Sequence, residues 1–354
     1  MAHISLKEVS HAYNANTDSE TRVLENINLE IPHGSAHALL GASGTGKTTL
    51  LKIISGLLNP SDGDILVDGK QVNKASPRER NIAQVFQFPV LYEHLAVFDN
   101  LAFPLRNRKV SRADISTRVK RIAKLLEIDA LLDRKALGLS IFDKQKVSLG
   151  RALVREDVSA ILLDEPLTAV EPSAKWRLRQ KLKQLQKDLS LTMIYVTHDQ
   201  LEAMTFADHI SVMHEGRIIQ TASPRELVDR PQHQHVGYFI GMPGMNFIPA
   251  SSATFLAPPE GATQTGFRPD QAIVKTEKSA ISLEVMVLDK QALSTKRGES
   301  WGLLTCKYQG VEIRTRQRLN IEVGSSAWLH VDQAHFFKNG WRIESRSMVQ
   351  DKNA

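Results

Sequence analysis

Cysteine and aromatic residues are scarce in this sequence, and long apolar runs are absent. The 354 residues include one cysteine, Cys306, which excludes an internal disulfide and is typical of a reducing compartment. No apolar run approaches the roughly 18 residues of a membrane span. Residues 1–13 lack the charged head and apolar core of a signal peptide. We therefore expect a cytoplasmic protein that reaches a membrane only through partners.

Charge of one sign is not concentrated in any segment. The formal net charge is +6, but lysine and arginine are scattered among acidic residues and form no long basic block. This distribution argues against nucleic acid as a partner. The chain is more than twice the ~150 residues typical of one domain, so we expect two domains. With 42% hydrophobic and 24% charged residues, both domains can bury ordinary globular cores.

Strand and helix patterns alternate along the chain up to about residue 239. Residues 4–9 and 23–31 alternate in polarity and predict two antiparallel strands. Short apolar runs then predict buried strands, and longer amphipathic patterns predict helices. The predicted strands are 36–40, 160–163 and 192–196, and the predicted helices are 48–58, 115–128 and 174–189. Such alternation indicates an α/β fold with a mainly parallel sheet covered on both faces.

The character of the sequence changes after about residue 239. Residues 253–266, rich in alanine, proline and glycine, are typical of a boundary. Beyond them, short alternating segments replace the helical patterns, at 281–288, 302–308, 311–316 and 326–330. We predict that these segments form a small all-β barrel.

A glycine-rich loop lies between the predicted strand 36–40 and the predicted helix 48–58. Its residues are Gly41-Ala42-Ser43-Gly44-Thr45-Gly46-Lys47-Thr48, which fit the pattern G-x-x-x-x-G-K-[ST]. The glycines let backbone N–H groups surround phosphates, Lys47 supplies charge to the β- and γ-phosphates, and the Thr48 hydroxyl can bind Mg²⁺. A chance glycine-rich turn is the alternative, but the flanking strand and helix are the context that this motif requires.

Two further groups of residues follow predicted strands. Asp164 and Glu165 come at the end of an apolar strand, where ligands bind in open α/β sheets. Asp164 can hold Mg²⁺, and Glu165 can orient and partly deprotonate an attacking water. His198 follows the strand 192–196 and can reach a γ-phosphate. The alternatives are an ordinary acidic pair and a structural histidine, and the functional interpretation of both depends on the glycine-rich loop.

These motifs, with Gln87 and the run 196–204 (Val-Thr-His-Asp-Gln-Leu-Glu-Ala-Met), resemble the ATPase subunits of ABC importers over the whole chain. Residues 241–247 and 266–269 resemble the start of the C-terminal domain in the sugar and polyol branch. The resemblance implies a P-loop NTPase domain at 1–238, with a RecA-like α/β core, an antiparallel β subdomain and a helical subdomain at about 88–153. An all-β, OB-like regulatory domain then follows at 239–354.

The resemblance also implies roles for single residues, with ATP and Mg²⁺ as ligands. Tyr13 stacks on adenine, and Gln87 contacts Mg²⁺ and the permease coupling region. The ATP-binding set is Tyr13, Ser43, Gly44, Thr45, Gly46, Lys47, Thr48 and Thr49. The metal set is Thr48, Gln87 and Asp164, and the catalytic set is Glu165, His198 and Lys47. The implied partners are two transmembrane permease subunits and, indirectly, a periplasmic or extracellular solute-binding protein.

The signature segment departs from the family. Where the family has Leu-Ser-Gly-Gly-Gln, this chain has Leu139-Ser140-Ile141-Phe142-Asp143. Two ATPases of the family close head to tail, so that each ATP lies between one P-loop and the signature of the other chain. The side chains of Ile141 and Phe142 and the charge of Asp143 should weaken that closure. Glu171 likewise stands in the place of the family's D-loop aspartate.

We therefore expect a heterodimer with a second, non-identical ATPase that carries an intact signature. Residues 80–108 and Lys144-Gln145-Lys146 resemble one of the two unequal ATPases of bacterial glycerol importers. The sequence thus predicts a peripheral ATPase at the cytoplasmic face of the bacterial cell membrane that drives import of glycerol or a related polyol. The alternatives are a sugar or glycerol-phosphate importer, a regulatory ATP-binding subunit, and a soluble ABC ATPase acting on DNA or ribosomes.

Overall fold

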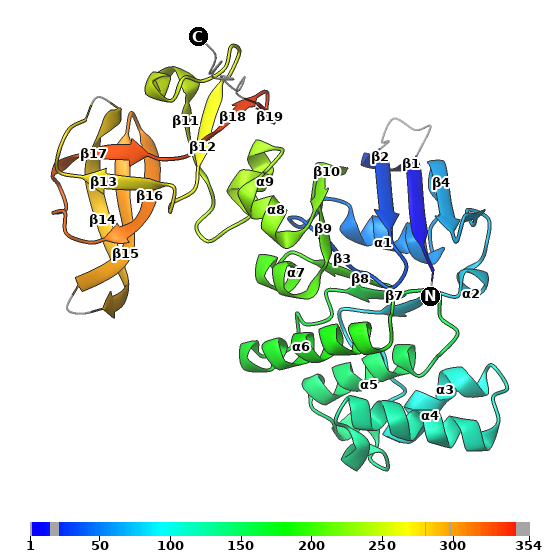
Figure 1. Ribbon diagram of the computed structural model, residues 1–354. Helices are drawn as coiled ribbons and strands as arrows, with labels where there is room; N and C mark the ends of the chain where they lie inside the picture. Colours follow the sequence, from blue (N-terminus) through cyan, green and yellow to red (C-terminus); the bar gives the residue numbers. More distant parts are fainter. Residues whose placement is uncertain (1, 15–20, 280, 297–298, 345–354) are drawn as a thin grey trace, which may run out of the picture. The chain divides into compact units, whose positions relative to one another are not determined.

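The computed structural model describes residues 2–14, 21–279, 281–296 and 299–344. The chain divides into two compact units, residues 1–224 and 225–354 (Figure 1). All the residues predicted for the nucleotide site belong to the first unit. Within the described residues, no helix is both long enough and apolar enough to cross a membrane.

A six-stranded sheet forms the centre of the first unit. Its strands are β3 (Ala36–Leu40), β6 (Ala83–Val85), β7 (Ile161–Asp164), β8 (Met193–Thr197), β9 (His209–His214) and β10 (Arg217–Ala222). They lie in the order β10-β9-β3-β8-β7-β6, and all neighbours are parallel except β9 and β10. The carboxyl ends of β3, β6, β7 and β8 therefore meet at one edge, which confirms the predicted α/β fold.

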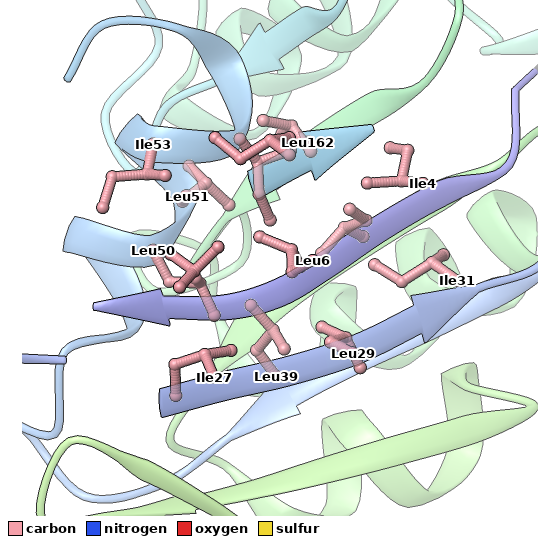
Figure 2. Packing of buried hydrophobic residues seen from close by; sticks show 14 of the residues in the cluster. Ile4, Leu6, Ile27, Leu29, Ile31, Leu39, Leu50, Leu51, Ile53 and Leu162 are labelled. Carbon is pink, nitrogen blue, oxygen red and sulfur yellow. The ribbon is translucent and has the colours of Figure 1, made fainter. Parts of the chain in front are cut away.

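An antiparallel sheet packs against the first helix of this unit. Its strands are β1 (Ile4–Tyr13), β2 (Thr21–Ile31), β4 (Asp62–Val67) and β5 (Lys70–Gln71), in the order β2-β1-β4-β5. Leucine and isoleucine side chains of β1 and β2 meet those of α1 (Lys47–Ser55) in one buried core, together with Leu39 and Leu162 of the central sheet (Figure 2). Each such side chain contributes about 1.5–3 kcal/mol by leaving water. The core therefore fixes α1, and the loop before it, against both sheets.

Three helices form the region predicted to be helical. They are α3 (Val97–Arg106), α4 (Arg112–Leu125) and α5 (Ile141–Leu153). Ile115, Val119 and Ile122 give α4 a buried face at helical spacing. Gly150 lets α5 approach α3 closely, because a Cβ there would lie 2.5 Å from Leu101 Cδ2. The unit also contains α2 (Pro77–Arg80), α6 (Pro172–Asp188), α7 (Gln200–Phe206) and the 3-10 turns η1 (Asp129–Leu131) and η2 (Ala136–Gly138).

Strands dominate the second unit, after α8 (Pro224–Asp229) and α9 (Gln234–Phe239). One sheet comprises β11 (Asn246–Pro249), β12 (Gln264–Phe267), β18 (His335–Lys338) and β19 (Trp341–Ile343), paired in that order. The other comprises β13 (Ala272–Lys275), β17 (Ser326–Val331), β14 (Ser282–Lys296), β15 (Glu299–Tyr308) and β16 (Val311–Arg318), again in pairing order. Two 3-10 turns, η3 (Ala250–Ser252) and η4 (Thr254–Leu256), follow β11.

The five-stranded sheet curls until its edge strands, β13 and β16, meet. The Gln317 side chain in β16 accepts a hydrogen bond from Val274 N–H (2.6 Å) and donates one to Val274 O (2.9 Å). Gln317 is buried, so its amide replaces a backbone ladder at this seam without leaving a polar atom unsatisfied. The all-β character predicted for the C-terminal part is confirmed.

Helices α8 and α9 pack with the strands that follow them. The buried Arg268 guanidinium donates hydrogen bonds to Val228 O (3.1 Å) and Gly237 O (3.2 Å), and also to Ile240 O. This clamp explains why the compact units divide between Pro224 and Arg225, earlier in the chain than the expected boundary between 238 and 239. The domain limits 1–238 and 239–354 stay a prediction.

Candidate active site

The glycine-rich loop between β3 and α1 depends on two residues in the left-handed region of backbone space. Gly44 has φ of 83° and Gly46 has φ of 94°. At Gly46 a Cβ would also lie 2.8 Å from Val23 O and 2.6 Å from Leu24 Cδ2, both in β2. Only glycine accommodates both the backbone conformation and this close approach. The antiparallel sheet therefore shapes the loop from one side.

The first turn of α1 is open to an anion. Gly46 is the N-cap, no side chain caps the helix, and the first turn has no acidic residue. The free N–H groups and the helix dipole at such a terminus favour negative charge, above all phosphate. Ser43, Gly44 and Thr48 are exposed around this terminus. The observation fits the predicted binding of nucleotide phosphates.

Lys47 is the buried cation of the loop. Its Nζ donates hydrogen bonds to Gly41 O (2.9 Å) and Ala42 O (2.8 Å), so the ammonium lies on the loop itself. Burial lowers the pKa of Lys47, and the charges of Glu165 and Asp164 act in the opposite direction. The two carboxylates are thus near enough to influence the lysine, as the shared sheet edge requires.

Tyr13 ends β1 close to the start of α1. Its hydroxyl lies 3.4 Å from Thr49 Oγ1, and its ring packs nearly perpendicular to the His11 ring at a centroid distance of 4.8 Å. Tyr13 is 39% exposed, so part of the residue remains accessible to a ligand. The structure therefore brings Tyr13 and Thr49 together beside the loop, and adenine stacking on Tyr13 stays a prediction.

Asp164 and Glu165 lie at the carboxyl end of β7. Burial and the neighbouring Glu165 charge raise the pKa of Asp164, whereas Lys47 and Lys52 act to lower it. Glu165 has φ of 43°, a left-handed conformation that is uncommon outside glycine and that recurs at functional sites. Its N–H donates to Val196 O in the adjacent strand (3.0 Å). The backbone of β8 therefore fixes the position of Glu165.

His198 follows β8 and faces Glu165. The His198 Nδ1 lies 3.1 Å from Glu165 Oε1, while the Thr168 hydroxyl donates to Glu165 Oε2 (3.2 Å). The His198 side chain is 53% exposed and that of Glu165 is 20% exposed. A carboxylate held at both oxygens and still reached by solvent can orient a water and accept its proton. The pair predicted from two separate strand ends is thus assembled at one place.

Gln87 comes two residues after β6, with its side chain partly exposed. Because β6 runs parallel to β7, with Val85 opposite Leu163, Gln87 leaves the sheet at the same edge as Asp164. The buried Gln145 of α5 donates to the neighbouring Phe86 O at 3.5 Å, so the segment is tied to the helical region. Contact of Gln87 with Mg²⁺ or a permease stays a prediction.

The donor set at this edge suits Mg²⁺ bound with a nucleotide. The described residues contain no cluster of three or more His, Cys, Asp or Glu that could hold a metal by itself. Mg²⁺ needs only one or two protein ligands when phosphates supply the others. The exposed Thr48 hydroxyl and the Asp164 carboxylate are of the right chemical type, and they would hold the ion.

The predicted signature segment forms the start of α5 and caps itself. The Asp143 N–H donates to Ser140 Oγ (3.1 Å), and the Ser140 hydroxyl lies 2.8 Å from Asp143 Oδ2. Ile141 is 54% exposed, and Lys146 Nζ sits 4.6 Å from the centre of the Phe142 ring. Glu171 is the N-cap of α6, without a side-chain cap hydrogen bond.

These two helix starts are not joined to the nucleotide edge. Among the hydrogen bonds and ion pairs of the described residues, none links Ser140–Asp143 or Glu171 to the loop Gly41–Thr48. A role of these helix starts toward another chain stays a prediction.

The sequence interpretation did not single out Thr197 and Glu202, two buried residues on either side of His198 in the chain. The buried Glu202 carboxylate accepts hydrogen bonds from Thr197 Oγ1 (2.9 Å) and Tyr195 OH (3.0 Å). Both Thr197 and Glu202 fall within the run 196–204 that carries the resemblance, but only the fold shows that they are bonded to one another. The only signal for this pair in the sequence was Glu202, an acidic residue in the first turn of a helix with no evident partner nearby in the chain.

Comparison with known proteins gives concordant matches. Residues 24–168 match the family model described as ABC transporter. The chain is 42% identical over 294 residues to the sn-glycerol-3-phosphate import ATP-binding protein UgpC 3 of Rhizobium johnstonii, covering 81% of this chain and 83% of that one. It is 42% identical over 273 residues to the trehalose/maltose import ATP-binding protein MalK of Thermococcus litoralis, covering 75% and 73%.

A solved structure is similar to part of the chain. This is cbiO1 of Clostridium perfringens, part of the ABC transporter complex cbiONQ, with a TM-score of 0.58 and 32% identity. The match covers 63% of this chain and 89% of that one. The likeness supports the assignment of the P-loop α/β fold.

Proposed function

The chain belongs to the ABC transporter family as the ATPase of an ATP-driven translocase, and from this premise we propose that it energises import of glycerol 3-phosphate or a sugar. One observation carries the catalytic part of the proposal: Lys47, Asp164 and the Glu165–His198 pair come together at one sheet edge beside an uncapped helix start. The relatives' names, which state glycerol 3-phosphate and trehalose/maltose import, supply the substrate class.

The proposed reaction is attack of water on the γ-phosphorus of ATP, which breaks the bond to the β–γ bridging oxygen and releases ADP and phosphate. The α1 terminus and Lys47 bind the phosphates, and Glu165 orients the water and accepts its proton. His198, 3.1 Å from Glu165, contacts the γ-phosphate and keeps the carboxylate in place. Mg²⁺, held by Thr48 and Asp164, would neutralise charge on the phosphates.

The proposed partners are two transmembrane permeases and, through them, a solute-binding protein. An exposed apolar segment supports a docking surface beside Gln87: Phe86, Phe88, Val90 and Tyr92 are 42%, 67%, 59% and 43% exposed. Apolar side chains gathered in this way mark an interaction site. The chain would then work as a peripheral subunit on the cytoplasmic face of the cell membrane.

We also propose a second, non-identical ATPase as partner. The start of α5 supports this, because Ser140 and Asp143 satisfy its N-terminus and place a carboxylate where a phosphate would bind. A partner with glycines in its signature would complete the site built on this chain's P-loop. The partner's own P-loop would face Ile141, Phe142 and Asp143.

Glycerol is the second candidate substrate. It rests on the resemblance of residues 80–108 and 144–146 to one of the paired glycerol-importer ATPases, and on the altered signature. The relatives' names favour the glycerol 3-phosphate or sugar assignment, which was the alternative in the sequence interpretation. A purely regulatory ATP-binding role is less well supported, because the Glu165–His198 pair is assembled.

The test is to isolate the tagged chain from native membranes in mild detergent and to identify copurifying proteins by mass spectrometry. The isolated complex is then reconstituted, and uptake of labelled glycerol 3-phosphate, maltose and glycerol is measured with ATP. We expect two permeases and a second ATPase with an intact Leu-Ser-Gly-Gly-Gln signature.

Recovery of this chain as the only ATPase would contradict the heterodimer, and its absence from membranes would favour a soluble ABC ATPase. Uptake of glycerol alone would replace the proposed substrate class with the second candidate.

A further inference from the structure

A buried carboxylate lies directly beneath the loop that carries His198. Glu202 in α7 is 3% exposed, yet its Oε2 accepts hydrogen bonds from Tyr195 OH (3.0 Å) and Thr197 Oγ1 (2.9 Å). Its Oε1 lies 3.7 Å from Lys175 Nζ of α6. Burying a carboxylate destabilises the folded state unless hydrogen-bond donors surround it. The two hydroxyl donors and the Lys175 ammonium at Glu202 therefore allow its burial.

Thr197 connects this carboxylate to the loop. Its hydroxyl donates to Glu202 and accepts a hydrogen bond from the Asp199 N–H at 3.0 Å. Asp199 in turn caps α7, because its Oδ1 accepts from Leu201 N–H (2.8 Å) and Glu202 N–H (3.2 Å). The residues before and after His198 are therefore both fixed, although the imidazole itself is half exposed.

We propose that Thr197 and Glu202 are positioning residues, which hold the His198 backbone so that its ring stays within reach of Glu165 Oε1. Both side chains are buried, and both act through His198. The inference rests on the proposed function, since it concerns the rate of ATP hydrolysis. A displacement of about 1 Å at a reacting group can cost about 10²-fold in rate, so the loss of one buried hydroxyl here should be visible in kcat.

The chain offers a matched control at the other end of the same strand. Thr192, just before β8, is also fully buried. Its Oγ1 accepts from Gly34 N–H (2.9 Å) and donates to Ala2 O (2.9 Å). Thr192→Val and Thr197→Val therefore remove the same group, each with one donated and one accepted hydrogen bond. The two differ in their distance from His198.

The experiment measures ATP hydrolysis by the assembled complex carrying Thr197→Val, Thr192→Val, Thr197→Ser or Glu165→Gln in this chain. Thr197→Val should lower kcat about 10- to 100-fold with little change in the KM for ATP. Thr192→Val and Thr197→Val should lower the melting temperature by similar amounts. Thr192→Val should nevertheless keep the wild-type kcat. Thr197→Ser, which retains the hydroxyl, should restore most of kcat.

A double variant separates positioning from general damage. In the His198→Ala background, Thr197→Val should cause no further loss of kcat, because the group that Thr197 positions is gone. If Thr197→Val does not fold, Glu202→Gln in the two backgrounds tests the same coupling, with a fall in kcat expected only where His198 is present.

Equal kcat values for Thr197→Val and Thr192→Val, or the same fractional loss with and without His198, would overturn the positioning role. Wild-type turnover in Glu165→Gln would instead overturn the proposed function, so the two failures are distinguishable.

Discussion

The N-cap of helix α1 is Gly46, which has no side chain to cap the helix, whereas the N-cap of α5 is Ser140, whose hydroxyl accepts a hydrogen bond from the Asp143 N–H. The first turn of α1 has no acidic residue, and the first turn of α5 contains Asp143. Both are helix N-termini with the same backbone dipole. A helix N-terminus therefore binds an external anion only where the chain leaves its N–H groups free.

The surroundings of the two helix starts extend this contrast. The start of α1 carries Lys47 and lies near the carboxylates of Asp164 and Glu165, which come at the end of β7 in the central sheet. The start of α5 has exposed Ile141 and a Phe142 ring covered by Lys146. We therefore expect substitutions at the first site to change catalysis and substitutions at the second to change stability or association.

The largest expected effect is that of Glu165→Gln. The amide cannot accept a proton from water, so hydrolysis by the assembled complex should fall about 10²- to 10⁴-fold, while ATP binding is kept. Phosphate release and equilibrium nucleotide binding are the two measurements. Hydrolysis within a few-fold of wild type would remove Glu165 from the proposed role.

Removing a lysine at the start of α1 should lower the affinity for ATP, whereas removing one at the start of α5 should not. Lys47→Ala should weaken ATP binding by about 1.5–3 kcal/mol, or about 10- to 150-fold, because a charged hydrogen bond to phosphate is lost. Lys144→Ala in α5, which removes a pairing with Glu93 at 2.9 Å, is the matched control and should leave ATP affinity unchanged. Calorimetric titration of both variants measures this, and equal losses would contradict the contrast.

His37 lies in β3, the strand that leads into the P-loop, and it should make the free energy of unfolding depend on pH. Burial, followed by the charge of His209, lowers the pKa of His37 from 6.5 to about 3. The unfolded chain binds a proton below pH 6.5 and the folded chain does not, so stability falls as pH decreases from 6.5 toward 3. The slope is at most about 1.4 kcal/mol per pH unit, or about 2 kcal/mol between pH 6.5 and 5.

His37→Gln should therefore flatten the decline in melting temperature of the first unit between pH 6.5 and 5. Its amide can still bond Ser211 Oγ, which the His37 ring meets at 2.9 Å. If the melting temperature of this variant still declined as steeply between pH 6.5 and 5, His37 would not be the source of the pH dependence.

The smallest expected effect is at the α5 cap. Ser140→Ala removes the acceptor of the Asp143 N–H and should cost about 1 kcal/mol of stability, with no change in ATP binding by the isolated chain. Thermal unfolding followed by circular dichroism measures the shift. A loss of ATP affinity would mean that α5 contributes to this chain's own nucleotide site.

The sequence predicted the parts of the site that are local in the chain. The P-loop pattern, its flanking strand and helix, and the strand-end residues Asp164, Glu165 and His198 all follow from short segments. Parallel pairing of the strands then implies that these residues lie together at the carboxyl edge of the sheet. The spacing of Ser140 and Asp143 was also a cap signal, but the sequence interpretation considered only the repulsion that Asp143 would exert on phosphate.

Other features depend on tertiary contacts that no short segment contains. Thr197 and Glu202 are close in the chain, but the burial that makes their contact specific comes from α6, α7 and β8 together. The seam closed by Gln317 joins strands far apart in sequence. The hydrogen bonds of Arg268, which join α8 and α9 to the strands within the second unit, likewise link residues up to about forty positions apart.

The most direct test of the contrast between α1 and α5 is sedimentation velocity of the full chain with and without Mg-ATP. The chain would carry Glu165→Gln to prevent turnover, and a second version would add Ile141→Gly, Phe142→Gly and Asp143→Gln. We predict that both versions bind ATP, and that only the second changes its sedimentation through ATP-dependent association with another copy. Equal ATP-dependent association by the first version would contradict the account, because the native start of α5 would then accept phosphate.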